Sequence, residues 1–139
     1  MKKKDPGRPT ITCSIGAQHF SNAICDLGAS VSVMPKVVYD KLNYHELAPI
    51  AMCLQLADQM VRFPAGIAEN VPFKIRNFFI PVDFVVLDME VDAKTPLILG
   101  RPFLSTANAH IDVGAGEIRF NINGQIERFA LRPEVEQCS

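Results

Sequence analysis

The chain has 139 residues, of which 48% are hydrophobic, and a formal net charge of only −1. This length and composition fit one globular domain that can bury a core. The near-zero charge provides no broad positive surface, so we expect no nucleic-acid partner, and we interpret the basic start Lys2-Lys3-Lys4 as a solvated tail. No apolar run approaches the roughly 18 residues needed to span a bilayer, and no signal peptide is visible. The sequence therefore predicts a cytoplasmic location without membrane association.

The N-terminal third of the chain is predicted to form a β-hairpin, a turn and a helix. Runs with strand character at Thr10–Ile15 and His19–Cys25 are separated by Gly16-Ala17-Gln18, a spacing that favours a hairpin. Asp26 then falls in the turn after the second strand. We expect a helix at Pro35–Leu42, because proline suits a first helical turn and apolar residues recur one turn apart.

The rest of the chain is predicted to consist mainly of strands. A polar tip, Ala57-Asp58-Gln59, joins expected strands at Met52–Leu56 and Met60–Phe63 into a hairpin. The apolar run 97–100 is expected to be a short strand that leads into a helix at Pro102–Ala107. Further strands are expected at Gly66–Ile75, Phe78–Leu87, Ala109–Val113, Glu117–Ile122 and Gln125–Leu131, with a tight turn at Asn123-Gly124. This pattern predicts an all-β fold with one or two short helices.

One domain is expected over residues 10–132. Neither a short-period repeat nor a low-complexity segment interrupts this stretch. Residues 1–9 are expected to form a flexible basic N-terminal tail, and residues 133–139 a C-terminal tail, because both ends are polar and lack strand patterning.

Asp26 is the candidate catalytic residue, because it closes the apolar run Ala23-Ile24-Cys25 and is followed at once by small residues. A carboxylate at the end of a buried strand costs several kcal/mol unless it is paired, hydrogen-bonded or protonated. The alternative is an Asp that only starts a turn, with Gly28 supplying backbone freedom. Two other Asp-x-Gly triplets are interpreted as turns, because Asp5-Pro6-Gly7 has no strand before it and Asp112-Val113-Gly114 leads into a short strand connection.

The cysteines and histidines are too scattered to predict a metal site, so no metal or other cofactor is expected. The four cysteines show no C-x-x-C pair and the three histidines stand singly, at Cys13, Cys25, Cys53, Cys138, His19, His45 and His110. We expect reduced thiols in the core. Sequence spacing alone leaves open a nucleophilic pair of Cys25 with a distant histidine, although nothing favours it over a buried thiol.

Two motifs together resemble one family. An Asp-x-Gly turn after an apolar strand, here in CDLGAS, is followed downstream by aliphatic residues and Gly-Arg, here in LILGRPFL. This combination is similar to the retropepsins, the single-lobe aspartic proteases of retroviruses and LTR retrotransposons. The segments LQLADQ and DFVVLDME add to a resemblance that is strongest for the gypsy-class elements of plants and spans Thr12 to Leu131 in the same order.

The resemblance implies a single-lobe closed β-barrel and an aspartic endopeptidase that hydrolyses the gag-pol polyprotein of a retrotransposon, in the cytoplasm or inside virus-like particles. Peptide hydrolysis by this chemistry needs two carboxylates that share a proton, and each chain supplies one credible aspartate, Asp26. A two-fold axis would place Asp26 opposite its own copy. We therefore expect a homodimer that binds an extended peptide and uses no cofactor.

The resemblance also assigns roles to residues around Asp26. Leu27, Gly28, Ala29 and Ser30 would complete the active-site loop. The predicted hairpin would be the flap over the cleft, formed by Leu56, Ala57, Asp58, Gln59, Met60 and Val61. The second motif would support the site and wall its apolar pockets, through Leu97, Ile98, Leu99, Gly100 and Arg101, although Leu97 and Ile98 are equally well explained as core residues.

The sequence departs from the retropepsin pattern at two positions in the active-site loop. Leu27 stands where Thr or Ser usually provides a hydroxyl that ties the two active-site loops together across the dimer. Ser30 stands where retroviral relatives carry an acid that pairs with the arginine matching Arg101, so Arg101 must find another partner or face solvent. These departures keep an alternative open, a catalytically weak or inactive retropepsin-like domain for dimerisation or peptide binding. An unrelated β-barrel binding module is the remaining alternative.

Overall fold

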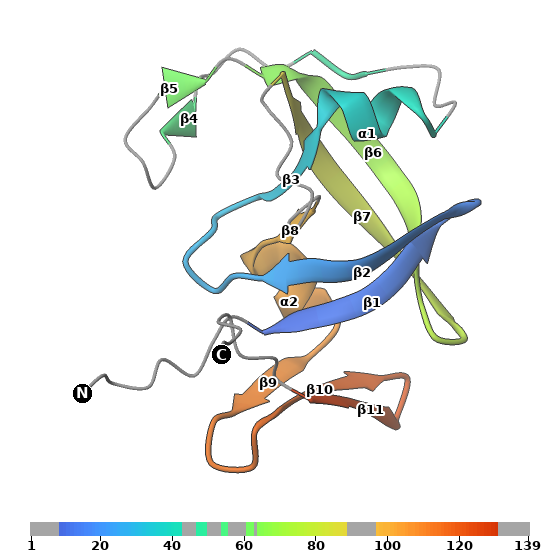
Figure 1. The fold of residues 1–139 in the computed structure, drawn as a ribbon, viewed down its shortest axis with the longest axis vertical. Coiled ribbons are helices and arrows are strands. Elements are labelled where there is room, and N and C mark those ends of the chain that lie inside the picture. The colour runs from blue at the N-terminus through green and yellow to red at the C-terminus, as the bar shows by residue number, and fades with distance from the viewer. Residues whose placement is uncertain are drawn as a thin grey trace, which may run out of the picture.

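The computed structural model describes residues 9–42, 47–49, 54–55, 61–62, 64–88 and 97–130. Strands dominate this part of the chain, and its helices are short (Figure 1). The elements in chain order are β1 (Thr10–Ile15), β2 (Gln18–Cys25), β3 (Ser32–Pro35), α1 (Lys36–Asp40), β4 (Leu54–Gln55), β5 (Val61–Arg62), β6 (Pro64–Ile75), β7 (Phe78–Leu87), β8 (Ile98–Leu99), α2 (Arg101–Thr106), β9 (Ala109–Asp112), β10 (Glu117–Ile122) and β11 (Gln125–Ala130).

Six of the strands close into a barrel in the order β1-β2-β8-β3-β7-β6. Strands β9, β10 and β11 form a separate three-stranded antiparallel sheet, and β4 pairs with β5. Figure 1 shows the three-stranded sheet at the opposite end of the molecule from the β4–β5 pair. The predicted closed β-barrel with short helices is thereby confirmed.

The hairpins follow from the alternation of buried and exposed residues and from turn residues with positive φ. In β1, Ile11, Cys13 and Ile15 point into the core while the residues between them are more exposed. The tight turn predicted at Asn123-Gly124 is confirmed, because both residues have positive φ, 54° and 83°, and Ile122 pairs with Gln125 across it. Positive φ at both central residues is the geometry that a two-residue hairpin turn needs.

A chain of phenylalanine rings connects the barrel to the C-terminal sheet. Phe73 of β6 lies 5.3 Å from Phe103 of α2, Phe103 lies 6.0 Å from Phe120 of β10, and Phe120 lies 5.8 Å from Phe129 of β11, measured between ring centroids. All three contacts are edge-to-face, a geometry worth about 0.5–1.5 kcal/mol per pair beyond the area buried. Barrel, α2 and sheet therefore share one hydrophobic core.

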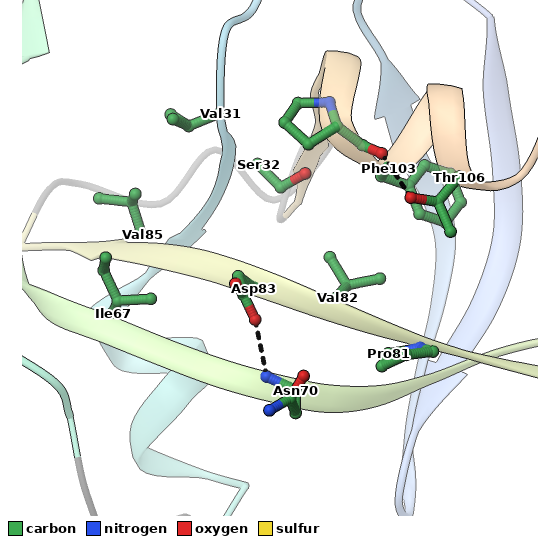
Figure 2. Close-up of a pocket in the computed structure, with 11 residues that line it drawn as sticks. Val31, Ser32, Ile67, Asn70, Pro81, Val82, Asp83, Val85, Phe103 and Thr106 are labelled. Atoms are coloured by element: carbon green, nitrogen blue, oxygen red, sulfur yellow. Dashed lines mark hydrogen bonds between the residues drawn. The ribbon is translucent and has the colours of Figure 1, made fainter.

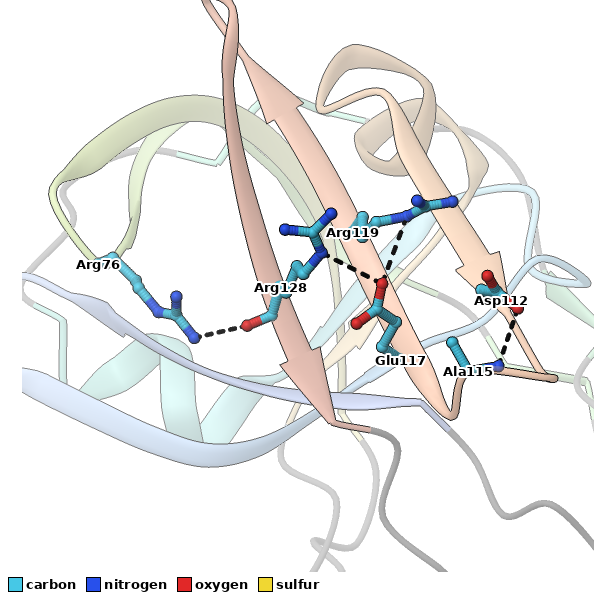
Figure 3. A network of polar contacts seen from close by, with 6 residues as sticks. All are labelled: Arg76, Asp112, Ala115, Glu117, Arg119 and Arg128. Carbon is cyan, nitrogen blue, oxygen red and sulfur yellow. Dashed lines mark hydrogen bonds and ion pairs between the residues drawn. The ribbon is translucent and has the colours of Figure 1, made fainter.

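Arg76, in the turn between β6 and β7, makes a polar connection to the same sheet (Figure 3). Its Nη1 lies 2.8 Å from Glu127 Oε1, its Nη2 donates to the backbone carbonyl of Arg128 at 2.8 Å, and its guanidinium lies 4.1 Å from the centre of the Phe129 ring. On the neighbouring strand, Glu117 Oε2 pairs with Arg119 at 3.6 Å and with Arg128 at 3.3 Å. The Arg76 contacts connect the sheet to the barrel, whereas the Glu117 pairs lie within the sheet.

The structure differs from the sequence predictions around residues 32–42. Strand β3 was not expected, because its four residues are all buried and show no alternation. Pro35 ends this strand with an extended ψ of 147°, so the helix begins at Lys36 and not at Pro35. The helix also ends early, at Asp40, because the amides of Lys41 and Leu42 bond three residues back, to Val38 and Tyr39.

Candidate active site

Asp26 lies directly after β2, in a loop that backbone hydrogen bonds hold at both ends. Its amide donates to the carbonyl of Leu99 at 2.9 Å, and its carbonyl accepts the amide of Ala29 at 3.1 Å. The amide of Gly28 donates to Asp26 Oδ1 at 2.9 Å, which closes an Asx turn. The carboxylate is exposed and hydrogen-bonded, so the burial cost expected for a charge at this position does not arise.

Strand β8 brings the second motif beside the Asp26 loop. It pairs in parallel with β2, where Ile24 is opposite Ile98 and Cys25 is opposite Leu99, and on its other side Val33 of β3 pairs with Ile98. The two motifs predicted to act together are therefore brought together by the fold.

The residues of β8 and its neighbours divide between two apolar clusters. Leu97 and Leu99 are fully buried in the main core, which accounts for their apolar character without any substrate. Ile98 is only partly buried and packs in a second, smaller cluster. That cluster also contains Val33, Val85, Leu87, Val31 and Ile67.

Gly100 lets the loop after Asp26 cross over the end of β8. A Cβ atom at Gly100 would lie 2.6 Å from the carbonyl carbon of Val31 and closer still to its oxygen, so only glycine allows this approach. The crossing is fixed by hydrogen bonds from Gly100 N–H to Ser32 Oγ and from Arg101 N–H to the carbonyl of Ala29, both at 2.9 Å.

Ser32 is a site residue that the sequence analysis missed. Among the described residues it is the buried polar one, with 3% of its surface exposed, and its hydroxyl accepts the Gly100 amide. A serine inside an otherwise apolar run was the available signal, since a buried hydroxyl must find a hydrogen-bond partner.

Arg101 contacts the backbone of Leu27, the first departure from the retropepsin pattern. Its guanidinium Nη1 donates to the backbone carbonyl of Leu27 at 3.3 Å, so Arg101 is exposed and also has a partner. The Leu27 side chain itself is 57% exposed, next to the exposed Asp26. Ser30 is also exposed. This face of the loop therefore presents one carboxylate and one large apolar side chain to its surroundings.

The predicted flap falls almost wholly outside the described residues. Val61 lies in β5, paired with Gln55 of β4, which agrees with the expected hairpin. Residues 56–60, which include Leu56, Ala57, Asp58, Gln59 and Met60, are not among the described residues.

Asp112 occupies a turn, as predicted. It ends β9, and its Oδ1 accepts the amide of Ala115 at 3.0 Å within the connection to β10 (Figure 3). Asp112 therefore lies in the C-terminal sheet, whereas Asp26 lies at the end of a barrel strand.

The buried thiols are poor nucleophiles. Cys25 is 2% exposed, and burial raises the pKa of its thiol to about 12. Burial, and then the neighbouring Cys25, raise the pKa of Cys13 as well. A nucleophilic role for Cys25 at neutral pH is therefore not supported, because the thiolate is the reactive form. Within the described residues, no group of His, Cys, Asp and Glu could hold a metal ion, and no helix is long and apolar enough to cross a membrane.

The sequence matches no family model, and no curated protein is similar to it at a significant level. The three-dimensional structure is nevertheless similar to solved structures. It superimposes on the retroviral protease-like domain of Ddi1 from Leishmania major with a TM-score of 0.66 and 19% identity, covering 93% of this chain and 95% of that one. It matches the EIAV protease in complex with the inhibitor HBY-793 with a TM-score of 0.61 and 22% identity, covering 81% of this chain and 99% of that one.

The fold is retropepsin-like. The fold class expected from the two sequence motifs is thereby confirmed. Within the retropepsin-like barrel, Asp26 directly follows β2, and the segment 97–101 contains β8, which pairs with β2.

Replacing Gly100 with alanine is expected to destabilise the protein, because the new Cβ would collide with the Val31 backbone. We expect a loss of about 1–3 kcal/mol in the free energy of unfolding, measured by urea denaturation. Gly114→Ala is the matched control, because its Cβ would meet only Asp112 Oδ1 at 3.5 Å, an ordinary contact. Equal losses in the two variants would contradict the crossing described above.

The core thiols are expected to resist alkylation in the folded protein. In a Cys53→Ser/Cys138→Ser background, iodoacetamide at about pH 8 should label Cys13 and Cys25 at least about a hundred-fold more slowly than in urea, because only thiolates react. Mass spectrometry measures the labelling, and equal rates in folded and unfolded protein would contradict the burial.

The same burial predicts a pH dependence of stability. The pKa values of the Cys13 and Cys25 thiols in the folded protein lie above 9.0, their value when unfolded. Because the unfolded chain therefore loses these protons first, the free energy of unfolding should fall as the pH rises above about 9.

Proposed function

We propose that this protein is an aspartic endopeptidase of the retropepsin type, active as a homodimer in which two Asp26 carboxylates activate a water molecule. The observation that carries the proposal is the exposed Asp26 carboxylate, held by the Gly28 amide in a loop that packs against Gly100 and Arg101 of a retropepsin-like barrel. Such a carboxylate is accessible to a water molecule and to a substrate, and the loop fixes its direction.

The chemistry requires a second carboxylate, and the geometry favours a second chain as its source. Asp112 lies in a turn of the C-terminal sheet, where its Oδ1 bonds the Ala115 amide. A two-fold axis beside the exposed loop would place Asp26 opposite the partner subunit's Asp26, because an isologous dimer sets each residue opposite its own copy. Two carboxylates at about 3 Å cannot both ionise, as is general for aspartic proteases, so one serves as base and the other as acid.

In the proposed reaction the ionised Asp26 takes a proton from the water while the protonated Asp26 of the partner subunit donates a hydrogen bond to the scissile carbonyl oxygen. The water oxygen then bonds to the carbonyl carbon. The newly protonated Asp26 gives this proton to the amide nitrogen, the peptide C–N bond breaks, and the Asp26 carboxylate is regenerated. Gly28 leaves room near the carboxylate, since a Cβ there would lie 3.2 Å from Asp26 Oδ1. The hairpin of β4 and β5 would cover an extended peptide bound as an added strand.

The substrate we propose is the gag-pol polyprotein of a gypsy-class LTR retrotransposon of the plant type. The motifs CDLGAS, LQLADQ, DFVVLDME and LILGRPFL support this origin. Residues 10–132 would then form the protease domain, with residues 1–9 and 133–139 as flanking tails, and the protein would act in the cytoplasm or inside virus-like particles.

Leu27 is the observation that favours a second candidate function. It offers no hydroxyl for the loop-to-loop contact usual in retropepsins, and it is 57% exposed in the single chain. A retropepsin-like domain without that contact could keep dimerisation or peptide binding while losing catalysis. Hydrolysis by the purified protein distinguishes the two candidates.

Asp26→Asn is expected to abolish cleavage of an apolar peptide panel at mildly acidic pH while leaving the fold intact, because it removes the base with little change in volume. Asp112→Asn is the matched control and should stay active, because the Asp112 carboxylate accepts the Ala115 amide in a turn of the C-terminal sheet. Cleavage is measured by mass spectrometry of the products. An active Asp26→Asn variant together with an inactive Asp112→Asn variant would refute the site assignment.

Leu27→Thr is expected to strengthen the dimer by restoring a hydroxyl at the proposed two-fold axis. A gain of about 1 kcal/mol corresponds to a roughly five-fold tighter dimer in sedimentation equilibrium and a similar rise in activity per chain at limiting concentration. Val37→Thr, at a 43% exposed apolar position on α1, is the control and should change neither quantity. A weaker dimer in Leu27→Thr would show that Leu27 packs against its partner, and a fully active monomer would refute the shared dyad.

A further inference from the structure

A cavity of about 370 Å³ lies between helix α2 and strands β3, β6 and β7 (Figure 2). Its size falls in the range of small ligand sites, roughly 300–1,000 Å³. Pro102, Phe103 and Thr106 line it from the helix, while Val82 and Pro81 line it from β7. The walls are therefore largely apolar.

One charged group lines this cavity, the carboxylate of Asp83. Figure 2 shows Asp83 directed toward Asn70 across the β6–β7 pair, where its Oδ1 accepts the Asn70 amide at 2.8 Å. Asn70 sits at an irregularity of β6 with a positive φ of 53°, a conformation that asparagine tolerates and that aims its amide at Asp83. The carboxylate is thus held in place by backbone geometry.

Two other polar side chains of the cavity already have hydrogen-bond partners. The Ser32 hydroxyl accepts the Gly100 amide, and Thr106 Oγ1 donates to the carbonyl of Pro102 at 2.9 Å. Asp83 differs, because a carboxylate can accept about four hydrogen bonds and one is filled here. No lysine, arginine or histidine lines the cavity, and within the described part of the chain Asp83 has no ion-pair partner.

The cavity lies close to the Asp26 loop along the chain. Val31, which lines it, comes directly after the active-site loop and lies five residues from Asp26, a span of at most about 18 Å. Val31, Ile67 and Val85 belong both to the cavity wall and to the small apolar cluster around Ile98. An extended peptide advances about 3.3 Å per residue, so the cavity lies within about five residues of a bond positioned at Asp26.

We propose that this cavity binds a lysine or arginine side chain of the substrate peptide, with Asp83 as the specificity-determining residue. The inference rests on the proposed peptidase function. The apolar walls suit the long aliphatic stem of such a side chain, and Asp83 supplies the complementary charge at its end. A glutamate side chain would meet the Asp83 charge and be disfavoured.

The test is a peptide array probed with the full-length Asp26→Asn protein, which binds without cutting. Each peptide has two central apolar residues, and every flanking position within five residues carries in turn lysine, arginine, norleucine or glutamate. Norleucine matches lysine in its stem and lacks the charge. At one flanking position we expect lysine and arginine to bind about three- to ten-fold more tightly than norleucine, an advantage that shrinks at high salt.

Asp83→Asn, added to the same protein, should remove the preference for lysine and arginine. Asparagine keeps an oxygen for the Asn70 amide, so the β6–β7 pair is expected to stay intact, which thermal unfolding monitors. Asp88→Asn is the matched control, because Asp88 is exposed at the end of β7 and does not line the cavity. It should leave the preference unchanged.

The outcomes separate this inference from the proposed function. A flat array, absence of binding, a preference that survives Asp83→Asn, or an equal loss in Asp88→Asn would overturn the role of Asp83. If the unmodified protein cleaves these peptides while the array of the Asp26→Asn protein shows no preference, the peptidase proposal stands and the subsite is refuted. An Asp83-dependent preference without cleavage would support the subsite and refute the peptidase.

Discussion

Insertion of β8 between β2 and β3 is the constraint on which the rest of the site depends. The carbonyl of Leu99 fixes the Asp26 amide, and Gly100 and Arg101 then bind the returning chain at Ser32 and Ala29. Without these contacts the loop would keep little more than its internal Asx turn. The close approach at Gly100 is tolerated because glycine carries no side chain, so one small residue sets how near the two segments can lie. These contacts hold the loop in which Asp26 and Leu27 are exposed.

Local patterns predicted much of the fold. Turn residues and alternation located the hairpins, as at Gly16 and at Asn123-Gly124, where positive φ is required. The pairing of the Asp26 loop with segment 97–101 followed from the resemblance to a family, not from local physics, because nothing near either segment encodes its distant partner. Predictions were least accurate where residues are buried on all sides, as in β3, which carries no periodic signal.

Two functional features carried at most a weak signal in the sequence. Ser32 is a common residue type, and its importance lies in a hydrogen bond to a glycine 68 positions away. Asp83 alternates with buried residues along β7, as an exposed strand residue normally does. Only the packing of α2 over the β6–β7 pair turns that exposed position into part of a cavity.

The long sequence separation within the site has a consequence for how the protein is made. Arg101 and Leu27, which touch in the folded chain, are 74 positions apart. Contacts of such high sequence separation must pay a loop-closure entropy before they contribute stability, and they slow folding. A growing chain that already displays Asp26 cannot yet hold it in the geometry described, because β8 has not been synthesised. The active-site loop can therefore form only after β8, the last barrel strand in chain order, has been synthesised. This delay follows from the topology and needs no inhibitor.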